Sequence, residues 1–136
     1  MAFREKTAWV TLLSYLGVYG YYFWTVFRAG PDHPFGARLI GVIALLVLII
    51  VVCNIALAIW KPEEARLAED ERERLIGLKA TAVAFHVASA GAITAAGAVA
   101  VGLPSFYVAN GLLAMVVLAE IVRQGLVVVR YRLGGA

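Results

Sequence analysis

Four apolar stretches, each about twenty residues long, dominate this chain of 136 residues. The second contains the run IALLVLIIVV at 43–52, which has no polar residue. A helix needs about 20 mostly apolar residues to cross a hydrocarbon core about 30 Å thick. The sequence therefore predicts four transmembrane helices, over about 7–27, 39–60, 79–101 and 107–129.

The composition argues against an ordinary soluble domain. Apolar residues make up 62% of the chain and charged residues 15%, whereas soluble domains contain about half and about a quarter. A soluble fold of this size does not bury that much apolar surface. We expect an all-α, integral membrane four-helix bundle that forms a single membrane domain over 1–136.

Lysines and arginines indicate the orientation. With four spans, both termini and the connection over 61–78 share one face, and that face holds Arg4, Lys6, Lys61, Arg66, Arg72, Arg74, Lys79, Arg130 and Arg132. The opposite face holds Arg28 and Arg38. Because Lys and Arg accumulate on the cytoplasmic side, we expect the N and C termini in the cytoplasm. Topology and lipid headgroups also explain the net charge of +3, so we expect no nucleic-acid partner.

The connection over 61–78 is polar, charged and helix-prone. Asp70 and Arg74 form an attractive pair at a spacing of four residues, and Pro62 suits the first turn of a helix. We expect the third helix to begin in water, around 63–73. We also expect this cytoplasmic loop to bind a partner through its charged residues, Glu69, Asp70, Glu71, Arg72 and Arg74.

Alanine recurs every fourth residue along the third span, from Ala80 to Ala100. Small residues at this spacing let two helix backbones approach closely, and close packing is a main source of helix association in lipid. The pattern predicts a helix-packing seam at Ala84, Ala88, Ala92 and Ala96. The seam packs within the chain in one interpretation and joins two copies in the other.

Polar residues inside the spans fall at similar depths. At 1.5 Å per residue, Asn54, His86 and Arg123 lie about 10 Å inside the cytoplasmic boundary, and Glu120 about 15 Å, near the midplane. The pattern predicts an intramembrane polar cluster of Tyr15, Asn54, His86, Glu120, Arg123 and Gln124.

Charged residues at this depth usually face a partner or a water-filled cavity. The predicted cluster is therefore a clasp that fixes helix register, or a proton or ion pathway that uses Glu120 and His86. A shifted span with Glu120 at the interface is the third interpretation. In the first span, Tyr15 and Tyr19 predict helix packing, with a quinone or lipid-tail site as the alternative.

The chain lacks the common catalytic and cofactor motifs, including HExxH, CxxC, the P-loop and GxGxxG. We therefore expect no enzyme, no cofactor and no metal site. The leading hypothesis is a non-enzymatic accessory, assembly or regulatory subunit in contact with the lipid bilayer and with another copy or another membrane protein. The alternative is an oligomeric small channel or proton-coupled transporter that uses Glu120 and His86.

Three segments carry a resemblance to a known group of proteins. They are REKTAWVTLLSYLGVYGYYF at 4–23, DERERLIGLKA at 70–80 and LAEIVRQGLVVVRYRLG at 118–134. Together they resemble small bacterial predicted inner-membrane proteins of unknown function. The resemblance implies a four-span, multi-pass protein of the bacterial inner membrane. It draws attention to Glu71, Arg72 and Glu120 without assigning them a role.

Overall fold

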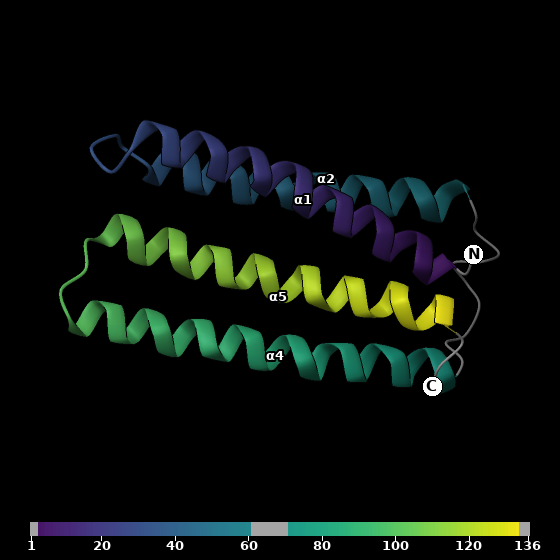
Figure 1. Ribbon diagram of the computed structural model, residues 1–136. Coiled ribbons are helices and arrows are strands. Elements are labelled where there is room, and N and C mark those ends of the chain that lie inside the picture. Colours follow the sequence, from purple (N-terminus) through teal and green to yellow (C-terminus); the bar gives the residue numbers. More distant parts are fainter. Residues whose placement is uncertain (1–2, 61–70, 134–136) are drawn as a thin grey trace.

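A computed structural model describes residues 3–60 and 71–133, and these residues form four α-helices and no strand. The helices are α1 (Phe3–Ala29), α2 (Gly36–Trp60), α4 (Glu71–Ala100) and α5 (Ser105–Leu133) (Figure 1). Each predicted apolar segment lies almost entirely within one helix, and the helices extend a few residues beyond most of the predicted limits. The all-α prediction is therefore confirmed. The predicted start of the third helix, around 63–73, lies mostly outside the described residues.

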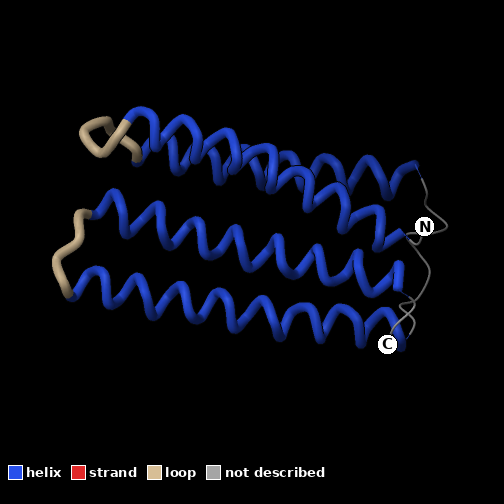
Figure 2. Tube along the Cα trace, in the orientation of Figure 1, coloured by secondary structure: helices blue, strands red, loops and turns tan. Residues whose placement is uncertain are grey.

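The helices run alternately in opposite directions. α1 begins and α5 ends at one end of the molecule, and the two short turns at 30–35 and 101–104 lie at the other end (Figure 2). α4 packs on α5, α5 packs on α1, and α1 packs on α2. α5 and α1 are therefore the inner helices of a row, while α4 and α2 each have one principal neighbour.

Glycine allows both turns to leave a helix sharply. Gly30 and Gly102 have φ angles of 79° and 74°, in the left-handed region that side chains disfavour. The Gly30 amide donates to the Val26 carbonyl at 3.1 Å, and the Leu103 amide donates to the Ala98 carbonyl at 3.0 Å. These bonds satisfy carbonyl groups at the helix ends that lack a partner within the helix.

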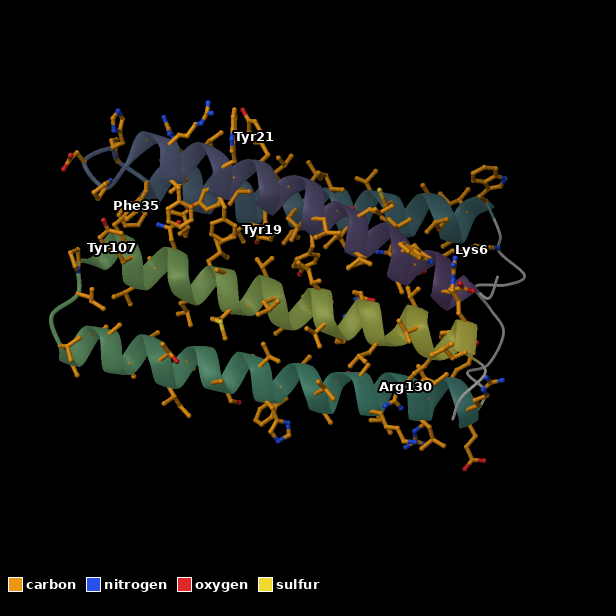
Figure 3. The ribbon with its side chains drawn as sticks, in the orientation of Figure 1. Lys6, Tyr19, Tyr21, Phe35, Tyr107 and Arg130 are labelled. Carbon is orange, nitrogen blue, oxygen red and sulfur yellow. The ribbon has the colours of Figure 1, made fainter. Side chains whose placement is uncertain are left out.

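Aromatic side chains fill the core between α1 and α5, toward the turns. Tyr19, Tyr22 and Phe106 are buried there together with Val26, Leu46 and Val117. The Phe35 and Phe106 rings meet edge to face with their centroids 5.3 Å apart, a favourable geometry for aromatic pairs. Tyr19 and Phe35 point toward α5, whereas Tyr21 points away from it (Figure 3). These contacts bring the turn at 30–35 against α5.

Three helices, α2, α4 and α5, are long and apolar enough to cross a membrane. Much of their apolar surface is exposed: α2 buries Leu46 but exposes Leu48, Val52 and Ile59. Exposed apolar area of this extent is typical of a lipid-facing surface. α1, with 27 residues, has the length of a span, but its tyrosines, tryptophans and glycines lower its mean hydropathy.

The predicted alanine seam lies only partly against a neighbouring helix. Ala84 is buried and Ala88 is half-buried, but Ala92 and Ala96 are exposed. Four residues turn a helix by about 40° more than a full revolution, so a strict four-residue series drifts off one face. The face of α4 that contacts α5 runs instead through Ala80 and Ala84 to Gly91, which is buried against Met115.

Candidate functional site

A charged cluster lies within α5. Arg123 donates to the Glu120 carboxylate from Nη2 at 2.6 Å and from Nε at 3.1 Å. Gln124 donates to the same carboxylate from Nε2 at 2.7 Å. Donors three and four residues after Glu120 reach it because these positions share one face of a helix. All three side chains come from one helix turn, so the helix itself sets their geometry.

The cluster is only partly covered by the rest of the chain. Gln124 is buried, but 22% of the Glu120 side chain and 41% of the Arg123 side chain remain exposed. Counted back from Arg130, Arg123 lies about 10 Å and Glu120 about 15 Å along the helix. An ion pair that deep in a hydrocarbon layer needs a polar neighbour, a partner chain or water around it.

Tyr15 is half-buried on α1, and its ring centroid lies 5.7 Å from that of Tyr19. Within the described residues no hydrogen bond joins Tyr15 to Glu120, Arg123 or Gln124. The structure therefore brings together three of the six predicted residues, Glu120, Arg123 and Gln124.

His86 and Asn54 do not take part. His86 is exposed on α4, where its Nδ1 lies 2.7 Å from the Ala82 carbonyl oxygen. Asn54 donates from Nδ2 to the Ile50 carbonyl of its own helix at 2.8 Å. These contacts leave both residues outside the hydrogen-bonded part of the predicted cluster. Both polar groups are satisfied by the backbone four residues earlier, a common arrangement for polar side chains in apolar helices.

A second polar contact, between α1 and α5, was not predicted. The Tyr22 hydroxyl donates to Asn110 Oδ1 at 2.9 Å, and Asn110 Nδ2 donates to the Phe106 carbonyl at 2.8 Å. Tyr22 is 4% exposed and Asn110 is 1% exposed. The available signal was an asparagine in an apolar run, which is costly in hydrocarbon unless it is paired.

A third contact joins α1 and α5 at the opposite end from the turns. Glu5, which is buried, pairs with Arg132 at 3.5 Å. The Arg132 guanidinium also lies over the Trp9 ring, 5.4 Å from its centroid. The pairing with Glu5 gives Arg132 a structural contact within the chain.

The predicted partner-binding loop is only partly described. Glu69 and Asp70 lie outside the described residues, while Glu71, Arg72 and Arg74 are exposed on the first turn of α4. Within 3–60 and 71–133, no three His, Cys, Asp or Glu side chains are grouped to hold a metal ion. The Glu120 cluster is thus the candidate site in which the described side chains make the most hydrogen bonds to one another.

No protein-family model, curated protein or solved structure matches the chain. The hydrogen bonds of the Glu120 cluster fix the geometry of the charged pair. Part of the polar surface of this pair on α5 is not covered by the rest of the chain.

Proposed function

We propose that this protein crosses the membrane with all four helices and acts as a non-enzymatic accessory, assembly or regulatory subunit of a membrane complex. The proposed fold is a four-helix bundle with the N and C termini in the cytoplasm. Support for α1 as the fourth span comes from its neighbours. It packs antiparallel to both α5 and α2, and these two helices are apolar enough to span.

The distribution of basic residues supports the orientation. Lys6 and Arg130 lie at the same end of the molecule (Figure 3), together with Arg72, Arg74, Lys79 and Arg132, whereas Arg28 and Arg38 lie toward the end with the turns. Basic residues favour the cytoplasmic face. The resemblance to small bacterial proteins adds the bacterial inner membrane as the proposed location.

The partly exposed Glu120–Arg123 pair is the observation that carries the functional proposal. A partner helix against α5 would exclude lipid from both side chains and supply polar contacts, which removes the penalty of placing them in hydrocarbon. A second copy or another membrane protein meets this requirement. The charged residues at the start of α4 then offer a further contact surface outside the membrane.

Cysteine crosslinking in native membranes tests this proposal. In a Cys53→Ser background, Val116→Cys reports on the α5 face that carries Glu120, because the two residues are four positions apart and Val116 is exposed. Ile93→Cys reports on the competing α4 seam, and Leu48→Cys on α2 is the lipid-facing control. We expect crosslinked products from Val116→Cys, and fewer of them when Glu120 and Arg123 are both replaced by leucine. Monomers at all three positions would contradict the proposal.

The alternative is an oligomeric channel or proton-coupled transporter, and the partial exposure of Glu120 is the observation in its favour. His86 is exposed on α4 and bonds its own helix, so a path that uses both residues requires a second chain. Proton flux into liposomes that falls in Glu120→Gln and in His86→Gln would favour this alternative. The expectation of no catalysis and no cofactor rests on the sequence alone.

A further inference from the structure

An open groove of about 770 Å³ lies between α1 and α2. Its walls come from α1 between Leu13 and Thr25 and from α2 between Arg38 and Ile49. At 1.5 Å per residue these segments are about 17 Å long, close to half of a hydrocarbon core about 30 Å thick. The groove therefore has the length of a lipid tail in one leaflet.

Two glycines lie in the walls of the groove. Gly17 of α1 and Gly41 of α2 both line it, and a Cβ atom added to either would meet no atom within 4 Å. Aliphatic side chains such as Val18 and Leu45 form the rest of the wall. The groove is thus mostly apolar and open along one side.

Three hydroxyl groups that line the groove are hydrogen-bonded within the protein. The hydroxyls of Ser14 and Thr25 donate to backbone carbonyls of α1 at 2.8 Å, and the Tyr22 hydroxyl donates to Asn110. Arg38, by contrast, is exposed and makes no hydrogen bond or ion pair with any described residue. The groove consequently has an apolar length and an unpaired cation at one end.

We propose that this groove binds one tail of an anionic phospholipid, with the Arg38 guanidinium on the lipid phosphate. The proposal does not depend on the function proposed above. Guanidinium groups pair well with phosphate, and Arg38 lines one end of the groove. Charge complementarity selects this occupant, because the groove joins an apolar length of about 17 Å to a cation at one end.

Native mass spectrometry of the full chain in mild detergent tests the proposal, with dioleoyl phosphatidylglycerol and dioleoyl phosphatidylcholine as probes. One basic residue at a lipid surface contributes about 1 kcal/mol, which corresponds to about a fivefold preference for the anionic lipid. We expect wild type to show this preference and Arg38→Gln to lose it. Gly17→Leu adds a side chain to the groove wall at a position where a Cβ atom meets no other atom within 4 Å, and it should lower the retention of both lipids.

Two matched variants serve as controls. Arg28→Gln removes a cation near the turns whose guanidinium lies over the Trp24 ring, 4.4 Å from its centroid, and Gly20→Leu enlarges α1 outside the groove. Both should bind lipid as wild type does. The proposal is overturned if Arg38→Gln keeps the preference or if Gly20→Leu lowers retention as much as Gly17→Leu. It is also overturned if wild type is a lipid-free dimer that Gly17→Leu dissociates, because a second chain would then occupy the groove.

Discussion

Replacement of Gly91 by alanine is the most direct test of how α4 packs on α5. A Cβ atom at this position would lie 2.9 Å from Met115 Cγ and closer still to Met115 Cβ, while ordinary contacts begin at 3.4 Å. Met115 Cβ is attached to the α5 backbone, so a change of rotamer does not move it. The two helices therefore have to separate by roughly 1 Å to relieve the overlap.

The expected loss of stability follows from that separation. A gap of about 1 Å removes about a quarter to a half of the attraction between atoms in contact, and overpacking a tight interface typically costs about 1–3 kcal/mol. Gly97→Ala is the matched control, because Gly97 is in the same helix and an added Cβ there meets nothing within 4 Å. Helix propensity changes equally in both variants. We therefore expect Gly91→Ala to be less stable than Gly97→Ala by about 1–3 kcal/mol.

Titration with sodium dodecyl sulfate in mixed micelles, followed by near-ultraviolet circular dichroism, measures this difference. A second comparison uses Met115→Gly as the background. Without the Met115 side chain, Gly91→Ala should no longer lower the free energy of unfolding, because the overlapping atoms are gone. Equal unfolding midpoints for Gly91→Ala and Gly97→Ala would refute the close approach of α4 to α5 at this point.

Three other contacts make predictions that the same unfolding assay checks. Tyr22→Phe should lower the free energy of unfolding by about 1 kcal/mol, because it leaves the buried Asn110 Oδ1 without its donor. Tyr21→Phe changes an exposed residue and should not lower that free energy measurably. Arg132→Gln should lower the free energy of unfolding by less than about 1 kcal/mol, because the Arg132 side chain is 62% exposed. A decrease of more than about 2 kcal/mol would show that the pair with Glu5 stabilises the protein more than its exposure suggests. Glu120→Leu leaves the positive charge of Arg123 without its carboxylate partner. We therefore expect the double variant Glu120→Leu, Arg123→Leu to be more stable than Glu120→Leu alone by about 1–4 kcal/mol. A double variant less stable than Glu120→Leu would show that the two side chains do not act as a pair.

The positions of the helices were predictable from the sequence, and their contact faces were not. Long apolar runs bounded by Gly30 and Gly102 define where helices end, because those glycines adopt left-handed conformations. α2 is apolar on every side, so its pattern gives no sign that Leu46 is buried while Val47 is exposed. In a soluble protein the polar face of a helix supplies that information. The alanine series indicates the α5-facing side of α4 only as far as Ala84 and Ala88, because spacing of four residues does not stay on one face over a long helix.

The polar residues inside the helices separate into two classes by what they need from their surroundings. Ser14, Asn54 and Thr94 each donate to a carbonyl four residues earlier in their own helix, so they impose no requirement on neighbouring helices. Depth along a helix therefore does not identify partners, and Asn54 and His86 share a predicted level with Arg123 without contacting it.

Glu120 and Arg123 belong to the other class. Their bonds to each other and to Gln124 hold the carboxylate in place, yet both side chains keep exposed surface that hydrocarbon does not solvate. A helix that served only to pack this chain would be expected to cover such a pair or to lack it. The exposed surface of Glu120 and Arg123 is thus the strongest physical reason to look for a second chain against α5.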